Sequence, residues 1–200
     1  MASLQGPAPS LRGVGGSEVL SRSDVCIRPR RPDDVPALAG VLMAQQSLTR
    51  YPFRDPLPVP VEQFLHADDA LAAWTAEVAG RPAGHVCRVA SPRGPSAPQM
   101  NGACAQAHGC AVEDLGWVST LFVDPAARGL GIGRALVDTV VDDMRAAGLR
   151  PCLEVLPLHS AALSLYESAG WQEVLRLRPD WLRTAAGEVP PDVRVLILPA

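Results

Sequence analysis

The sequence has no long uncharged apolar run, because proline, glycine or charge interrupts each apolar stretch well before the ~20 residues that cross a bilayer. It also has no surplus of positive charge, since 18 Lys and Arg stand against 21 Asp and Glu for a formal net charge of −3. A protein that binds nucleic acid without sequence preference usually carries a basic patch. We therefore expect neither a membrane span nor a nucleic-acid partner.

A secretion signal and a disulfide framework are lacking too. Residues 1–23 have no continuous apolar block and consist largely of Gly, Pro, Ser and scattered charge. The five cysteines are odd in number and widely spread, which favours reduced thiols. Cys104, His108 and Cys110 lie close together but match no standard zinc spacing, so we expect no metal site. We interpret 1–23 as a disordered tail of a cytoplasmic protein.

The order of apolar segments indicates one domain of mixed α/β class over residues 24–200. A chain of 200 residues with 48% hydrophobic residues is long enough to bury a full core. Strands are predicted at 25–28, 71–78, 83–89, 117–123, 152–156, 171–177 and 193–198, and helices at 35–42, 61–65, 131–147 and 160–169. This order predicts a mixed sheet with helices on both faces.

Two segments show no regular apolar pattern. Residues 47–60 hold four prolines, and a long proline-rich loop in a compact domain is often functional. Residues 91–114 are rich in Gly, Pro, Ala and Ser, which predicts a flexible insertion without regular structure.

A glycine-rich loop, Arg128 to Arg134, joins the strand at 117–123 to the next helix. Its three glycines at alternate positions let the backbone bend sharply, so that several N–H groups converge on one anion. The helix start adds unpaired N–H donors and the positive end of the helix dipole. The loop lacks the Lys-Ser or Lys-Thr of a Walker motif, and its third glycine is one residue early for a dinucleotide fingerprint. It indicates either a different kind of pyrophosphate site or a tight turn without a ligand.

Residues 123–136 resemble the acetyl-CoA signature of the GNAT superfamily of N-acetyltransferases, whose core is Arg or Gln, two residues, Gly, one residue, and Gly or Ala. Residues 159–171 resemble that family's helix ending in Tyr, then Gly and an aromatic residue, here Tyr166, Gly170 and Trp171. The close resemblance covers 117–171. It implies a GNAT-type central mixed sheet of about seven strands with helices on both faces.

The resemblance also implies a cleft between the strands at 117–123 and 152–156 for the pantetheine arm of acetyl-CoA, with backbone N–H groups of the first strand directed at the thioester oxygen. The expected cofactor contacts are Leu121, Phe122, Val123, Arg128, Gly129, Leu130, Gly131, Ile132, Gly133, Arg134, His159 and Tyr166. Tyr166 matches the tyrosine that protonates the leaving thiolate, although its spacing alone fits a core aromatic residue. His159 stands where the family often has Asn.

The general base is less well defined, because many relatives place a Glu in the strand position of Trp117. Glu113 and Glu154 are the expected catalytic carboxylates, with Asp114 and His85 as alternatives and a water relay as a further route. The loop after the first helix helps form the acceptor site in relatives, so Tyr51 and Arg54 are expected to contact the acceptor. Arg50 and Arg54 lie in this loop, and either could pair with an anionic group on the acceptor or remain solvated.

We therefore expect an acyl-CoA-dependent N-acyltransferase that transfers acetyl from acetyl-CoA to a primary amine of a small molecule or peptide by direct attack. One alternative is a catalytically silent CoA-binding module, since Trp117 and His159 depart from the family pattern. Another is a protein N-terminal or lysine acetyltransferase, with 91–114 in its binding surface. The C-terminal strands could pair across a homodimer.

Overall fold

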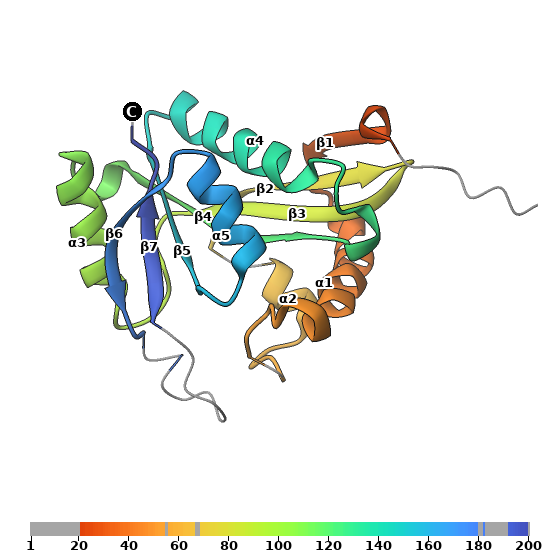
Figure 1. Cartoon of the computed structure of the whole chain (residues 1–200), viewed down its shortest axis with the longest axis horizontal. Coiled ribbons are helices and arrows are strands. Elements are labelled where there is room, and N and C mark those ends of the chain that lie inside the picture. The colour runs from red at the N-terminus through yellow and green to blue at the C-terminus, as the bar shows by residue number, and fades with distance from the viewer. Residues whose placement is uncertain (1–20, 55, 67–68, 180–181, 183–191, 200) are drawn as a thin grey trace, which may run out of the picture.

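The computed structural model describes residues 21–54, 56–66, 69–179, 182 and 192–199 (Figure 1). The strands are β1 (Val25–Pro29), β2 (Ala70–Val78), β3 (Arg81–Val89), β4 (Leu115–Val123), β5 (Arg150–Val155), β6 (Gln172–Leu177) and β7 (Val193–Ile197). The α-helices are α1 (Val35–Thr49), α2 (Val61–His66), α3 (Ala97–His108), α4 (Ile132–Ala146) and α5 (Ser160–Ser168). Most of the expected tail, residues 1–20, lies outside the described residues. No helix of the described chain is long and apolar enough to cross a membrane.

The seven strands form one mixed sheet, which confirms the predicted fold class. Their order is β1-β2-β3-β4-β5-β7-β6, and β4 with β5 is the parallel pair among antiparallel neighbours. A parallel pair needs a crossover, which α4 supplies between β4 and β5. The last strand, β7, inserts between β5 and β6.

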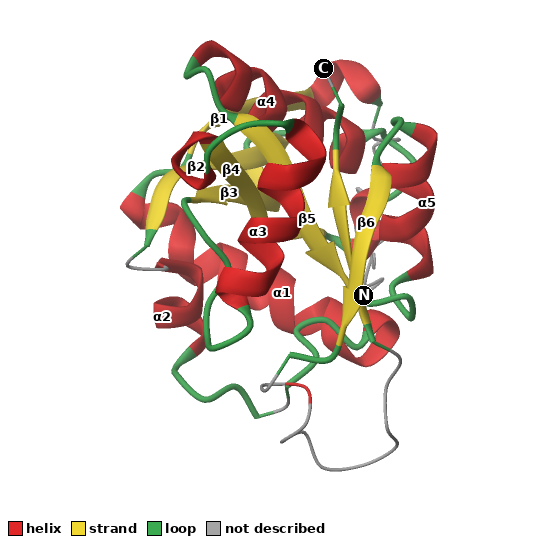
Figure 2. Ribbon diagram, turned by 90° about the vertical axis from the view of Figure 1, so that its left-hand side faces the viewer, coloured by secondary structure: helices red, strands yellow, loops and turns green. Residues whose placement is uncertain are grey.

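Helices cover both faces of the sheet (Figure 2). On one face α4 and α5 enclose the largest apolar cluster. Its α4 members recur every four positions, as the sequence predicts, and are at most 1% exposed: Ile132, Leu136, Val140 and Met144. Burying each such side chain contributes about 1.5–3 kcal/mol. On the other face α1 and α2 form a smaller cluster with Phe122, while α3 joins a third with Trp117.

Helix α3 was not predicted, and the expectation of a segment without regular structure is wrong for residues 97–108. The helix contacts β6 and β7. It buries only a few small or medium apolar side chains, Met100, Cys104 and Ala105, so its apolar period is too short to stand out in the sequence. The available signals were Pro98 in the first turn and Gly109, which ends the helix with a φ of 65°.

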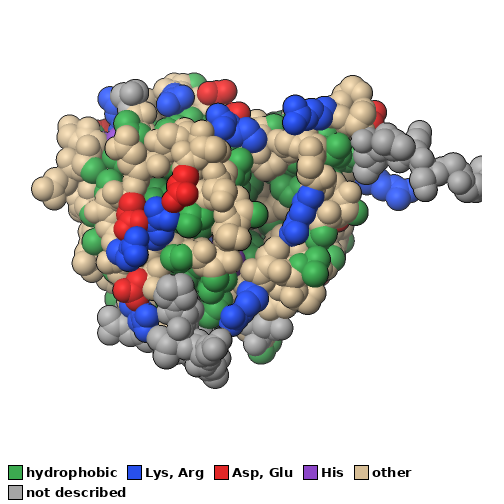
Figure 3. Space-filling model, viewed as in Figure 1, with side chains coloured by type: hydrophobic (Ala, Val, Ile, Leu, Met, Phe, Trp, Pro, Cys, Tyr) green, Lys and Arg blue, Asp and Glu red, His purple; other side chains and the backbone are tan. Residues whose placement is uncertain are grey.

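Ion pairs join side chains of the edge strand β6 and its neighbour β7, where acidic and basic side chains form a mixed group on the surface (Figure 3). Arg194 of β7 pairs with Glu167 and Glu173, and Arg176 also pairs with Glu173. Exposed pairs of this kind contribute only about 0–1 kcal/mol each. Charges along an edge strand also oppose pairing with a second sheet. Pairing of the C-terminal strands across a homodimer stays a prediction.

The parallel pair of β4 and β5 ends part-way along both strands. Leu115 to Val118 pair with Arg150 to Leu153. Within the described chain the two strands make no pairs beyond this point, although β4 continues to Val123 and β5 to Val155. The strands thus separate at the position where the family resemblance places the pantetheine arm.

Candidate active site

The glycine-rich loop at the start of α4 is shaped as an anion-binding turn requires. Gly129 and Gly131 have φ values of 82° and 80°, which favour residues without a Cβ. Gly131 is the N-cap of α4, a 15-residue helix, so the first N–H groups of the helix lie directly after the turn. Asp124 stabilises the approach to the loop, because its side chain accepts a hydrogen bond of 2.9 Å from the Ala126 N–H.

Three arginines surround this loop, and one of them was missed. Arg128 is exposed within it, whereas Arg134 donates its Nε to Asp138 at 2.9 Å on the next turn of α4. Arg22, just before β1, lies against Gly131: its Nε is 3.8 Å from the point that a Cβ at residue 131 would occupy. Arg22 carries no signal in the sequence, because it belongs to the segment interpreted as a tail.

Tyr166 lies in α5 on the α4 side of the sheet. Its side chain is 5% exposed and meets the Trp171 ring edge-on, with the ring centroids 5.8 Å apart. Burial raises the pKa of the phenol above its ordinary value of 10. The hydroxyl therefore stays protonated at neutral pH, as a proton donor must.

Glu154 is the residue of β5 that follows its last pair with β4. Its Oε2 atom is buried and has no hydrogen-bond partner in the described part of the chain. Burial disfavours the charged carboxylate and raises its pKa from 4.5 to about 7. A carboxyl group that exchanges its proton near neutral pH is suited to general-base catalysis.

Tyr51 brings the loop after α1 to these two residues. Burial raises the pKa of its phenol most, the nearby Cys87 thiol raises it further, and a hydrogen bond with the Thr120 side chain opposes the shift, while smaller electrostatic effects of Tyr166 and Glu154 also raise the pKa. The Tyr51 ring meets His159 edge-on at 5.6 Å. The structure thus brings together Tyr51, Glu154 and Tyr166, which are far apart in the sequence.

His159 is held by the same loop. It is the N-cap residue of α5 and its Nε2 lies 3.4 Å from the Arg50 carbonyl oxygen. Burial lowers the pKa of its ring. Arg54 lies further along the loop and is partly buried. The contacts of Tyr51 and Arg54 with an acceptor remain predictions.

Glu113 does not join this group. It is exposed in the 3₁₀ turn Val112–Asp114 ahead of β4. Glu154 lies four residues along β5 from Arg150, the partner of Leu115 at the start of β4. Four residues at about 3.3 Å each separate the level of Leu115 from that of Glu154 by roughly 13 Å. Glu113 and Asp114 precede Leu115 in the chain and so lie at least this far from Glu154 along the strand direction. The interpretation of Glu113 as a catalytic carboxylate is not supported by this placement.

The side chains of the β4 residues expected near the thioester lie on different faces of the sheet. The Phe122 side chain is 3% exposed and stacks on His85 on the α1 side, so only its backbone faces the region between the strands. Leu121 and Val123 pack partly against the α4 cluster. His85 is fully buried and both ring nitrogens have partners, so it is not placed to accept a proton from an acceptor.

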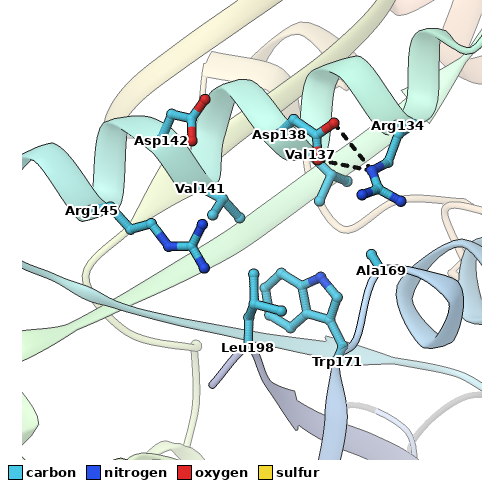
Figure 4. A pocket seen from close by; sticks show the side chains of 9 residues that line it. All are labelled: Arg134, Val137, Asp138, Val141, Asp142, Arg145, Ala169, Trp171 and Leu198. Carbon is cyan, nitrogen blue, oxygen red and sulfur yellow. Dashed lines mark hydrogen bonds and ion pairs between the residues drawn. The ribbon is translucent and has the colours of Figure 1, made fainter. Parts of the chain in front are cut away.

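A groove of about 410 Å³ lies between α4 and the segments after α5 and β7 (Figure 4). Trp171 and Leu198 form one wall, and Val137 and Val141 face them from α4. The groove includes Arg134 but none of Tyr51, Glu154 or Tyr166. It is therefore distinct from the group of residues suited to proton transfer.

These features, a glycine turn before α4, separated β4 and β5 strands, and a buried Tyr on α5, agree with the family comparison. The model of the Acetyltransferase (GNAT) family matches residues 41–171. The chain therefore belongs to this family.

Individual relatives match shorter stretches. A mycothiol acetyltransferase of Geodermatophilus obscurus is 45% identical over 60 residues, which is 30% of this chain and 20% of that protein. The [ribosomal protein bS18]-alanine N-acetyltransferase of Escherichia coli is 35% identical over 85 residues, 40% of this chain and 55% of that one. The N-alpha-acetyltransferase RimI of Mycobacterium tuberculosis is 46% identical over 57 residues, 28% and 35% of the two chains. The chain thus spans about half the length of these curated relatives, or less.

Solved structures confirm the fold over most of the chain. A GCN5-related N-acetyltransferase from Kribbella flavida has a TM-score of 0.66 at 19% identity, covering 90% of this chain and 100% of that one. The ribosomal-protein-S18-alanine N-acetyltransferase of Escherichia coli has a TM-score of 0.60 at 19% identity, covering 88% and 95%.

Proposed function

We propose that the protein transfers acetyl from acetyl-CoA to a primary amine by direct attack of the amine on the thioester. The observation that carries this proposal is that a buried carboxyl group of pKa about 7, Glu154, and a buried phenol, Tyr166, both lie near Tyr51, with Glu154 directly after the point where β4 and β5 separate. A silent CoA-binding module has no need of an unpartnered buried carboxylate, which lowers the stability of the fold.

The cofactor is positioned by backbone more than by side chains. The pyrophosphate binds the N–H groups of Gly129 to Gly133 at the start of α4, with the guanidinium groups of Arg128 and Arg22 adding charge. The pantetheine arm passes between β4 and β5 beyond Val118, where the β4 edge has N–H groups without a strand partner. The thioester then lies near Leu121 to Val123.

Proton transfer balances as follows. Glu154 takes one proton from the acceptor ammonium, directly or through a water, which frees the nitrogen lone pair to form the C–N bond. The oxyanion that develops on the carbonyl is stabilised by β4 N–H donors. As the C–S bond breaks, Tyr166 protonates the departing thiolate, and the second proton lost by the nitrogen restores the phenol.

The acceptor is a primary amine of a small molecule or peptide, bound on the α1 side next to Tyr51. The matching relatives are named for mycothiol, for an alanine of a ribosomal protein and for N-alpha-acetyl transfer, so a small amine and a peptide with a free N-terminal alanine are the first acceptors to test. We place the reaction in the cytoplasm.

Isothermal titration with acetyl-CoA followed by thiol-release turnover tests this function. Peptides with free N-terminal alanine, N-terminally blocked peptides with one lysine, and small amines form the acceptor panel. The chain contains no lysine, so any acetyl-lysine in the mixture comes from the acceptor. Binding with turnover, lost in Glu154→Gln, is the expected result. Binding without turnover of any acceptor would favour the silent module, and no binding would refute the assignment of the glycine loop.

A further inference from the structure

Thr120 holds a strained conformation in the middle of β4. Its φ is 52°, in the left-handed region that is strained for a β-branched residue. The strand pairing explains the position. His85 pairs with Phe122 while Cys87 pairs with Ser119, so β4 carries one extra residue opposite β3. Thr120 is therefore part of a β-bulge, which turns the peptide groups that follow it.

His85 is bonded directly to the backbone of this bulge. Its Nδ1 lies 3.0 Å from the Thr120 carbonyl oxygen and its Nε2 lies 3.2 Å from Nη1 of Arg30. Because a carbonyl only accepts, Nδ1 carries the proton and Nε2 accepts from Arg30. The ring is fully buried and stacks on Phe122 with centroids 5.5 Å apart. Burial lowers the pKa of the imidazole to about 4, so the ring is neutral at physiological pH.

Arg30 anchors the histidine to α2. The same guanidinium donates to the Leu65 carbonyl oxygen, and its Nη2 lies 3.4 Å from the carbonyl oxygen of His66. A continuous chain of contacts thus runs from the end of α2 through Arg30 and His85 to the Thr120 carbonyl. Such a network can over-determine a conformation that the local sequence disfavours.

We propose that His85 is a positioning residue for acetyl transfer: its Nδ1–H bond to the Thr120 carbonyl fixes the bulge that directs the β4 amides after Thr120 at the thioester oxygen. The inference rests on the proposed function. The bulge lies two residues past Val118, the last β4 residue paired with β5, so it shapes the strand where β4 first has a free edge. Loss of the bond leaves the donors present but misaimed, and displacement of about 1 Å in such a site costs about a hundredfold in rate.

Two substitutions of similar polarity separate this role from a merely structural one. Asn at position 85 places its amide nitrogen near the site of Nδ1 and keeps a donor for Thr120, whereas Gln places it near Nε2 and does not. We expect His85→Gln to lower kcat about ten- to a hundredfold while the Kd for CoA stays within about twofold of the wild type. His85→Asn should restore kcat to within about threefold of the wild type.

Infrared difference spectra of bound [1-¹³C]acetyl-CoA read the hydrogen bonds to the thioester carbonyl without any acceptor. The wild-type protein and His85→Asn should shift the carbonyl band to lower frequency, and His85→Gln should not. A shifted band in His85→Gln, or equal kcat in the two variants, would overturn the positioning role. A wild-type protein that shifts the band but acetylates no amine would instead refute the proposed function, and the band would still decide the role of His85.

Thr120→Gly tests the same step from the strand, in combination with His85→Gln. Glycine adopts a φ near 52° at little cost, so the bulge then depends less on its hydrogen bond. His85→Gln should therefore lower kcat by a smaller factor in the Thr120→Gly background than alone. Equal factors in both backgrounds would show that the histidine does not act through the bulge.

Discussion

Replacing Glu154 with Gln should stabilise the protein at high pH while abolishing turnover. The carboxyl group has a pKa of about 7 in the fold against an ordinary value of 4.5, which the unfolded chain adopts. Between these values the folded state binds a proton that the unfolded state has lost, so stability falls as the pH rises from about 4.5 to 7. At about 1.4 kcal/mol for each pH unit, the loss is about 3 kcal/mol. Gln imitates the protonated acid and does not titrate.

Urea unfolding followed by tryptophan fluorescence at pH 5 and pH 8 measures this difference. For each protein, the free energy of unfolding at pH 8 is subtracted from the value at pH 5. This difference should be larger for the wild-type protein than for Glu154→Gln, by up to about 3 kcal/mol. At pH 8 the variant should be the more stable of the two. A control, Glu113→Gln, alters an exposed carboxylate and should leave the pH dependence as in the wild type.

The same substitution should reduce kcat/KM about 10²–10⁴-fold, the usual contribution of a positioned general base. In the wild-type protein kcat/KM should rise with pH through about 7, because the carboxylate is the active form. That ascending limb should disappear in Glu154→Gln. Retention of the limb with undiminished turnover would assign the base elsewhere, and identical pH dependence of stability in both proteins would show that the carboxyl group is not desolvated in the fold.

Three further substitutions probe other parts of the molecule. Tyr166→Phe should lower kcat at least tenfold with little change in the Kd of acetyl-CoA, and full turnover in a folded variant would refute its role as the acid. Gly131→Val forces a branched side chain to a φ of 80° and should weaken acetyl-CoA binding more than tenfold by calorimetry, unless the loop does not contact the cofactor. Asp34→Asn should cost up to about 3 kcal/mol in urea unfolding at pH 7, because Arg28 stays largely buried and loses one of its two carboxylate partners, with Glu77 as the other. Since Arg28 holds the pKa of Asp34 well below 3.8, the wild-type advantage should shrink as the pH falls below about 4, and an advantage independent of pH would contradict this account.

The sequence predicted the parts of the fold that rest on repeated apolar patterns. The four-residue period of α4 and the glycine-rich turn before it are both present where expected. Helix α3 was missed because its buried side chains are few and small, so no period separates it from a loop. An element can therefore be predicted from the sequence when it buries enough apolar side chains to produce a clear period.

The candidate site likewise contains residues that the sequence indicates and contacts that only the folded structure shows. Tyr166 and Glu154, whose catalytic roles stay predictions, could be proposed because one lies in a family motif and the other in a strongly apolar strand. The contact of Arg22 with the glycine loop and the bond from His85 to Thr120 depend on tertiary packing between segments remote in sequence. A left-handed threonine in a strand leaves no mark in the sequence, since threonine ordinarily favours extended backbone. Glu113, by contrast, was attractive for its chemistry alone, and the strand register removes it from the site.

The place of β7 bears on how the chain folds during synthesis. β7 follows the other six strands in the chain, yet it lies between β5 and β6 and supplies the second neighbour of the strand that carries Glu154. Until residues 193–197 leave the ribosome, β5 keeps an open edge and α3 lacks one of the strands it covers. Assembly of the strand that carries Glu154 is thus delayed until β7 has been synthesised, and chains without β7 expose an aggregation-prone edge that chaperones and proteases would recognise.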